Sequence, residues 1–380
     1  MRRPAFRRPR RPDLGDRRLR RRILLAGGVG LAVWAAVALL PRALPREATV
    51  MVEAARRMEQ AIAVIRGHRE RNGPPMDDAA DPNRTGLVGP EVGELTTSLG
   101  SLESKRTAAS PELAALIAHL LRRAGAGPGT TVAVGASGSF PGLLVATLCA
   151  VGAVGARPVT ILSLGASTWG ATAASFDLLD LYRLLEESGL APAPPALVTP
   201  GGGEDVGGGL ETQERARLLE RVRGGGAPWL EEPDLRRNTA ERMRIYEMAA
   251  GAGPVAVFVN IGGGYANLGT SGLALGLRPG LNTRVVLPPE EERGVLHEMA
   301  ARGRPVIHLL NLKGLASRYG LDWDPVPLPE PETSRFVRGH SYPPRPVLLL
   351  TLLLLVVSGI LLFPSRAEGW YGSSGDKEVL

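Results

Sequence analysis

The sequence has little cysteine and few aromatic residues. Its 380 residues include one cysteine, Cys149, and only 5 Trp, 6 Tyr and 6 Phe. A single cysteine excludes an intrachain disulfide, a thiolate zinc cluster and a dithiol redox pair. Cys149 follows Leu148 and precedes Ala150, which indicates a buried and inert thiol. The sequence identifies no metal site, and the cofactors stay unknown.

The positive charge of the chain is concentrated at the N-terminus. The net charge is +7, but residues 1–22 alone hold eleven Arg against two Asp. The rest of the chain is close to neutral and lacks the basic face that nucleic-acid-binding domains show. We therefore expect no nucleic acid among the partners. The length accommodates one large domain or two smaller ones in addition to anchoring segments.

Two uncharged apolar runs, residues 23–40 and 346–363, are typical of transmembrane helices. At about 1.5 Å of rise per residue, the first reaches roughly 27 Å, close to the hydrocarbon thickness of a bilayer. The Arg-rich residues 1–22 should stay in the cytoplasm. Two spans in the cell (inner) membrane would then leave both termini cytoplasmic and residues 42–345 extracytoplasmic.

A cleaved signal peptide is the alternative for the first run, and Arg21-Arg22 even resembles a twin-arginine signal. Residues 41–45 lack a small-x-small cleavage site, which favours an uncleaved anchor. The domain faces outward under either interpretation.

Short β-branched runs alternate with amphipathic helical patterns between the two apolar runs. The strands are expected at residues 131–134, 159–164, 196–199, 255–260 and 306–310, with 228–230 as a candidate sixth. The helices are expected at residues 47–71, from 110 onward, and at 141–154, 176–188, 212–223, 233–250 and 290–301. This alternation predicts a doubly wound, mostly parallel α/β sheet of Rossmann-like type, preceded by N-terminal helices and flanked by the transmembrane helices.

The sequence thus divides into seven segments. They are an Arg-rich cytoplasmic tail (1–22), a transmembrane helix (23–40), an amphipathic helix and loop (41–110), the α/β domain (111–320), a Pro-rich linker (321–345), a second transmembrane helix (346–363) and a cytoplasmic tail (364–380).

Glycine- and hydroxyl-rich loops follow the predicted strands. Because the carboxyl ends of parallel strands share one edge, these loops should meet there and bind a ligand. The loop at residues 135–141 joins a strand to a helix and suits a carboxylate or phosphate. The alternative is a set of tight turns that bind nothing. The candidate ligand-binding residues are Gly135, Ser137, Gly138, Ser139, Ser167, Asp205, Asn260, Gly262, Gly263 and Asn311.

A second polar cluster, residues 96–107, lies before the sheet. Its Ser and Thr hydroxyls beside Lys105 and Arg106 suit a carboxylate-bearing ligand. The alternative is an ordinary loop, in which such runs are common. Asp205, with Glu204, lies between two glycine triplets and could either bind a cation or cap the next helix.

A nucleophilic serine is a further hypothesis, with Ser137 or Ser139 attacking and His308 as the base. The sequence Gly135-Ala136-Ser137-Gly138-Ser139 departs from the G-x-S-x-G elbow, because Ser139 replaces its last glycine. His308 lies between Ile307 and Leu309, where a structural histidine is the alternative.

Several of these strings together resemble the poly-gamma-glutamate system protein family (PgsW type). The resemblance covers most of the chain from about residue 47 to 329 and is carried by residues 81–89, 97–107, 132–141, 163–167, 204–207, 259–263 and 305–311. It implies a membrane-bound accessory to the synthesis, export or anchoring of poly-gamma-glutamate. Other subunits of that system and the anionic polymer would then be its partners.

Three hypotheses follow from these residues and this resemblance. The domain binds the polymer or a partner subunit, or it is an extracytoplasmic hydrolase or transferase of gamma-glutamyl amide bonds, or it is a scaffold held by its spans. The resemblance does not imply the ligase, because the chain lacks a P-loop for ATP.

Overall fold

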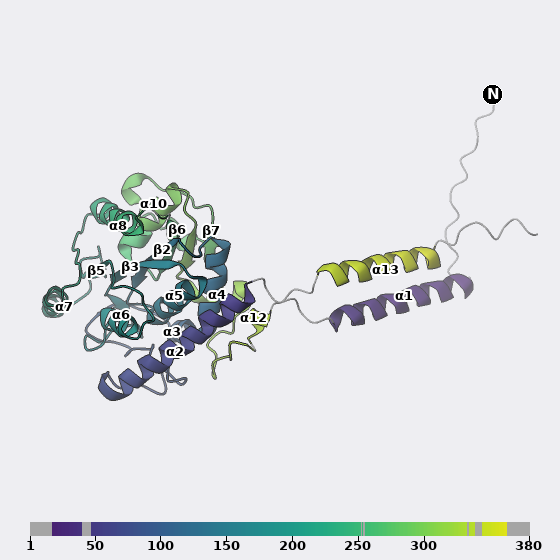
Figure 1. Cartoon of the computed structure of the whole chain (residues 1–380), viewed down its shortest axis with the longest axis horizontal. Helices are drawn as coiled ribbons and strands as arrows, with labels where there is room; N and C mark the ends of the chain where they lie inside the picture. The colour runs from purple at the N-terminus through teal and green to yellow at the C-terminus, as the bar shows by residue number, and fades with distance from the viewer. Residues whose placement is uncertain are drawn as a thin grey trace, which may run out of the picture. The chain divides into compact units, whose positions relative to one another are not determined.

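The chain forms two compact units. The computed structural model describes residues 17–39, 47–251, 253, 255–332, 334–338 and 344–362. One unit, Leu44–Arg338, contains the sheet and its covering helices, and the other combines Met1–Ala43 with Gly339–Leu380. Helices α1 (Arg17–Ala38) and α13 (Pro344–Leu362) of the second unit pack against each other (Figure 1).

One helix in the described part of the chain is long and apolar enough to cross a membrane. It is Leu19–Ala38 within α1. The apolar stretch Arg345–Leu361 of α13 is shorter. A first membrane-length helix is thus present, and the second span stays a prediction. Residues 17–22, expected in the tail, belong to α1, whereas residues 1–16, 40 and 363–380 lie outside the described residues.

Six strands form the main sheet, in the order β5-β3-β2-β6-β8-β7. They are β2 (Thr131–Ser137), β3 (Arg157–Ser163), β5 (Leu197–Thr199), β6 (Val255–Ile261), β7 (Gly280–Asn282) and β8 (Val306–Leu309). All neighbours are parallel except β7, which runs antiparallel to β8 at the edge. The predicted mostly parallel α/β sheet is therefore confirmed.

The sixth strand differs from the expected one. Residues 228–230 make only an isolated bridge between Trp229 and Val198, so they extend the β5 edge without forming a strand. The strand β7 instead completes the sheet. The chain starts at the central β2, builds outward to β5, and returns to the other side of β2 with β6. The strand order therefore reverses between β2 and β6, which is where doubly wound proteins have their ligand crevice.

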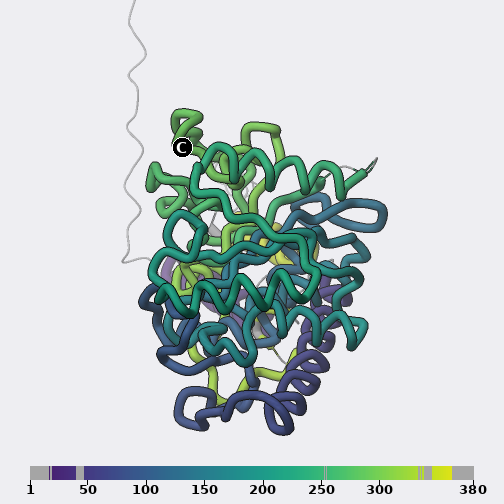
Figure 2. The backbone as a smooth tube through the Cα atoms, turned by 90° about the vertical axis from the view of Figure 1, so that its left-hand side faces the viewer, coloured from purple at the N-terminus to yellow at the C-terminus, as the bar shows by residue number. Residues whose placement is uncertain are grey.

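Helices cover both faces of the sheet. Three helices precede the main sheet, namely α2 (Ala48–Asn72), α3 (Leu102–Ala108) and α4 (Pro111–Arg123). The helices between the strands are α5 (Pro141–Val154), α6 (Leu178–Glu187), α7 (Thr212–Gly224), α8 (Leu235–Ala250), α9 (Tyr265–Leu268), the short 3-10 turns Leu273–Gly276 and Glu290–Glu292, and α10 (Val295–Ala301). Two helices follow the last strand, α11 (Leu312–Tyr319) and α12 (Arg335–Arg338). In Figure 1 α2 and α10 lie on opposite sides of the sheet, and in Figure 2 the purple tube of α2 lies at the lower end, away from the green tubes at the top.

The helix α2 belongs to the same unit as the sheet, since it packs on α4 and α5. The segment 41–110, expected to precede the domain, is therefore part of its core from residue 47 onward.

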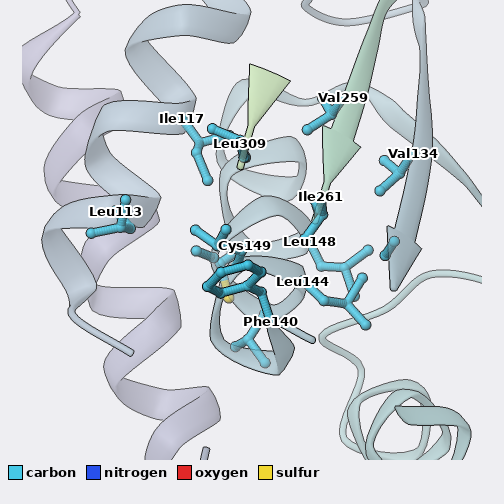
Figure 3. Close-up of a cluster of buried hydrophobic side chains, with 14 of the residues drawn as sticks. Leu113, Ile117, Val134, Phe140, Leu144, Leu148, Cys149, Val259, Ile261 and Leu309 are labelled. Atoms are coloured by element: carbon cyan, nitrogen blue, oxygen red, sulfur yellow. The ribbon is translucent and has the colours of Figure 1, made fainter. Parts of the chain in front are cut away.

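Two apolar clusters hold the layers together. The larger one joins α2, α4, α5 and α6 to one face of the strands, and the smaller one joins α8 and α10 to the other face. Figure 3 shows part of the larger cluster, where Leu144 and Leu148 of α5 meet Val134 of β2 and Ile261 of β6. Cys149 is buried in this cluster, and burial raises the pKa of its thiol to about 12.

A second, smaller sheet lies beside the main one. Strand β1 (Thr96–Ser98) pairs in parallel with β4 (Ala166–Ser167). Because β4 follows β3 and β1 precedes α3, this pairing brings the residues that lead into α3 to the carboxyl edge of the main sheet. The polar cluster expected before the sheet is therefore part of the same edge.

Candidate functional site

A cavity of about 390 Å³ opens at the carboxyl edge of the sheet, where the strand order reverses. Its walls come from the ends of β2, β3 and β6, from the glycine loop after β5, and from the β1–α3 segment. The lining residues are Thr97, Ser98, Leu99, Gly100, Ser101, Ser104, Lys105, Ser137, Ser139, Phe140, Ser163, Gly165, Ser167, Gly201, Gly202, Gly203, Gly263, Gly264 and Leu310. Seven of these residues are serines, so the cavity is rich in hydroxyl groups.

The β2–α5 loop offers hydrogen-bond donors to this cavity. Ser137 is the last residue of β2 and is only 5% exposed, yet among the described residues its Oγ has no hydrogen-bond partner. The backbone N–H of Ser139 likewise donates to no oxygen that the structure describes. The helix α5 begins at Pro141, and its N-cap residue Phe140 provides no side-chain cap. This wall therefore combines unpaired donors with the positive end of a helix dipole.

Lys105 is the ionisable residue of the cavity wall. It lies on the buried face of α3 and is 2% exposed. Its Nζ lies 2.6 Å from Ser167 Oγ, donates to the carbonyl oxygen of Ser139, and sits 4.0 Å from the centroid of the Phe140 ring. Burial lowers the pKa of Lys105 to about 7. The amine therefore exchanges between its charged and neutral forms near neutral pH.

No acidic side chain is among the residues that line the cavity within the described chain. The charged neighbours of Lys105 on α3 are engaged elsewhere. Glu103 is exposed and accepts a hydrogen bond from Ser101, and Arg106 forms two bonds of 2.6 Å with Asp324. Within the described part of the chain Lys105 therefore has no counter-ion, which suits an anionic ligand or proton transfer by the amine.

A buried ion pair supports the floor of the cavity. Arg242 of α8 and Asp205 of the glycine loop are each 1% exposed, and Arg242 Nη2 lies 2.6 Å from Asp205 Oδ2. Ser163, which lines the cavity, donates to Asp205 Oδ1 at 3.2 Å and accepts from Arg242 at 3.1 Å. Asp205 adopts a positive φ of 61°, a strained conformation for a residue with a side chain. The ion pair stabilises this conformation, so Asp205 has a structural role in the glycine loop after β5.

The remaining polar candidates do not line the cavity. His308 Nδ1 accepts a hydrogen bond from the side-chain amide of Asn260 at 3.1 Å, and burial lowers the pKa of His308 to about 4. Asn311 caps α11 by accepting from Gly314 N–H at 2.8 Å, and Arg106 pairs with Asp324 as described above. These side chains have structural partners.

The glycines divide between the wall and the layer behind it. Gly263 lines the cavity, whereas Gly135, Gly138 and Gly262 do not. Gly262 has a φ of 79°, and a Cβ at this position would collide with Ser137 Oγ. It therefore makes room for the unpaired hydroxyl. Of the candidates named from the sequence, the cavity brings together Lys105, Ser137, Ser139, Ser167 and Gly263.

Several lining residues were not among the sequence candidates, and Ser163 is the most informative of them. It ends β3 in direct register with Ser137 at the end of β2. A serine at or shortly after the carboxyl end of each of two predicted strands, 131–134 and 159–164, was therefore an available signal. Lysine usage was a second signal, because the chain has three lysines against 42 arginines and one of the three lies in this cavity.

No group of three His, Cys, Asp or Glu side chains that could hold a metal ion occurs among the residues searched, which are the described ones. Comparison of the chain with models of known protein families, with curated proteins and with solved structures gave no match.

Proposed function

We propose that the protein is a membrane-anchored accessory component of poly-gamma-glutamate synthesis or export, and that its cavity binds a glutamyl residue of the polymer. The observation that carries this proposal is the unpaired, buried hydroxyl of Ser137 in a cavity whose described lining residues supply donors and one amine but no acidic side chain. Such a wall favours an anionic ligand over a cationic one.

The resemblance to the poly-gamma-glutamate system family supports the choice of ligand. Its strings are far apart in the sequence, yet the cavity is lined from residues 97–107, 132–141, 163–167, 259–263 and 305–311. Residues 204–207 lie directly behind it, through the Asp205–Arg242 pair. A shared ligand-binding role would account for this convergence.

The α-carboxylate of a glutamyl residue fits the β2–α5 wall. Its oxygens would accept from Ser137 Oγ and from the N–H of Ser139 at the start of α5. A hydrogen bond to a charged group contributes about 1.5–3 kcal/mol, and 1.4 kcal/mol corresponds to a tenfold change in affinity. We therefore expect Ser137→Ala to weaken binding by roughly tenfold or more.

The anchor proposal rests on α1 and α13. Both are apolar helices of one compact unit, and α1 has a membrane-crossing length. At about 1.5 Å per residue, the 19 residues of α13 would reach roughly 28 Å, close to the hydrocarbon thickness. With the Arg-rich residues 1–22 in the cytoplasm, both termini would be cytoplasmic and the sheet-containing unit extracytoplasmic.

The binding proposal is tested by calorimetric titration of the full-length protein in detergent with gamma-linked pentaglutamate, at low and high salt. We expect saturable binding that persists at high salt, because a local site depends less on screening than a broad charged surface does. Ser137→Ala should lose affinity, whereas the exposed Ser188→Ala serves as the matched control. Absence of binding, or equal affinity for alpha-linked pentaglutamate and unrelated polyanions, would refute the proposal.

A further inference from the structure

We propose that Ser167 and Lys105 form a nucleophile and base pair that transfers the gamma-glutamyl acyl group of a chain bound in the cavity. The geometry carries this inference. Lys105 Nζ and Ser167 Oγ are 2.6 Å apart, both side chains line the cavity, and both are at least nine-tenths buried. The inference rests on the proposed function, since it takes the bound polymer as its substrate.

The surroundings of the pair are those that a lysine base requires. A lysine accepts a proton only in its neutral form, and its usual pKa leaves almost none of that form at neutral pH. Burial without an acidic partner lowers the pKa of Lys105 to about 7, so roughly half of the amine is neutral at that pH.

Four features position the two groups. The β1–β4 pairing places α3 beside Ser167, and Ser139 Oγ accepts from the Ser167 N–H at 3.0 Å. Gly100 lies so close to the pair that a Cβ there would be 2.8 Å from Ser167 Oγ and 3.2 Å from Lys105 Nζ. The Phe140 ring covers the amine from the α5 side. The pair is thus held in one arrangement and protected from bulk water.

The substrate geometry connects this pair to the carboxylate wall. In an extended gamma-glutamyl unit the α-carboxylate and the γ-carbonyl carbon are about 5 Å apart. A carboxylate bound at Ser137 and the Ser139 N–H leaves the γ-carbonyl of the same residue close to Ser139 and Ser167, which are in contact. Binding of the α-carboxylate at the β2–α5 loop therefore places the γ-amide beside Ser167 and Lys105.

The reaction balances without any oxidant, metal or cofactor. Ser167 Oγ attacks the γ-amide carbonyl carbon while its proton moves to the neutral Lys105 amine. The tetrahedral intermediate collapses, the C–N bond breaks, and the Lys105 ammonium gives its proton to the departing amine. Water, or the amine of another chain, then attacks the Ser167 ester, and the proton taken up by Lys105 returns to Ser167 Oγ. The products are a shortened polymer and either a free γ-carboxyl group or a new γ-amide.

This assignment differs from a Ser137 or Ser139 nucleophile with His308 as the base. His308 is paired with Asn260 and does not line the cavity, whereas Lys105 contacts a cavity serine directly. The roles of nucleophile and base therefore pass to Ser167 and Lys105, and Ser137 keeps a ligand-binding role.

The test uses the full-length protein in detergent, with gamma-linked pentaglutamate as substrate and a fluorophosphonate as a covalent probe. We expect release of shorter oligomers, and a mass adduct on the peptide that contains Ser167. Ser167→Ala should abolish the adduct and lower turnover by at least about 10³-fold. Lys105→Arg should do the same, because arginine keeps its proton. The exposed Lys313→Met and Ser188→Ala variants are the matched controls and should behave as the native protein.

The pH profile separates a base from a merely structural lysine. For the native protein, kcat/KM should rise with pH through about 7, the pKa of Lys105. Calorimetric binding and thermal unfolding of Ser167→Ala should remain as in the native protein, which shows that the variant is folded. Pentaglutamate binding without turnover or adduct would overturn this inference and leave the proposed function intact. Turnover that survives in Ser167→Ala would also overturn it, and absence of binding would overturn both.

Discussion

Loss of the Asp205 carboxylate should destabilise the domain strongly. In Asp205→Asn, the Arg242 guanidinium stays buried at 1% exposure and keeps its hydrogen bonds to Asn238 and Thr199, at 2.8 and 3.0 Å, but loses its counter-ion. Breaking a buried pair by removing one partner costs about 3–5 kcal/mol. Since a whole domain is typically stable by about 5–15 kcal/mol, this loss is a large part of the total.

Urea unfolding of the full-length protein in detergent, followed by tryptophan fluorescence, measures this loss. The double variant Asp205→Asn/Arg242→Met removes both charges and should cost less than the sum of the two single variants. The exposed pair of Glu241 and Arg244 is the matched control, and Glu241→Gln should change stability by at most about 0.5 kcal/mol. A loss below about 1 kcal/mol in Asp205→Asn, or strict additivity in the cycle, would refute the reasoning.

Three further predictions concern other parts of the molecule. The pKa of Lys105 is about 7 in the folded protein and 10.5 for an ordinary lysine, so between these pH values the unfolded chain binds more protons than the folded one. The unfolding free energy should therefore rise with pH over this range more steeply than in Lys105→Met. Urea titrations at several pH values measure this rise, and parallel curves for the two proteins would contradict the prediction. Gly262→Ala forces a side chain into a conformation with positive φ, against the Ser137 hydroxyl. It should lower the free energy of unfolding by roughly 1–3 kcal/mol and should also weaken the binding of pentaglutamate. Gly224→Ala should do neither, because a Cβ at Gly224 meets open space. Val286 is 71% exposed and Cys149 is buried, so in Val286→Cys the new cysteine should be the reactive thiol. A membrane-impermeant maleimide should label this variant in intact cells. Labelling only after lysis would contradict the proposed topology.

The sequence predicted most of the fold because its local signals agree with the tertiary structure. Helix α5 has the expected bounds, since Pro141 starts it and Gly155 ends it in a left-handed conformation. Strand β7 was not predicted, because Gly280–Asn282 is short and has no β-branched residue, and it is extended through pairing with β8. Helix α3 was missed for a related reason. It lies within the hydroxyl-rich residues 96–107, which are typical of a loop, but the Ser101 cap and the burial of its inner face stabilise a helix.

The site was predictable only in part. The edge of the sheet and its serine-rich loops follow from strand order and turn composition, and five of the named residues do line the cavity. The contact between Lys105 and Ser167 could not be predicted, because 62 residues separate them and two very short strands, β1 and β4, bring them together. The role of Asp205 was also inaccessible, since its partner Arg242 lies on a distant helix whose buried face includes this charged residue.

The small β1–β4 sheet has a consequence for the timescales on which the cavity wall moves. Its strands have three and two residues, so few backbone hydrogen bonds hold the β1–α3 segment beside the cavity, whereas β2 is paired on both sides along its length. Local opening of this segment therefore requires much less free energy than global unfolding. Amide hydrogens of β1 should exchange with solvent well before those of β2. On the proposed function, an internal stretch of the glutamate polymer would then enter the cavity from the side when the segment opens, without threading through by its end.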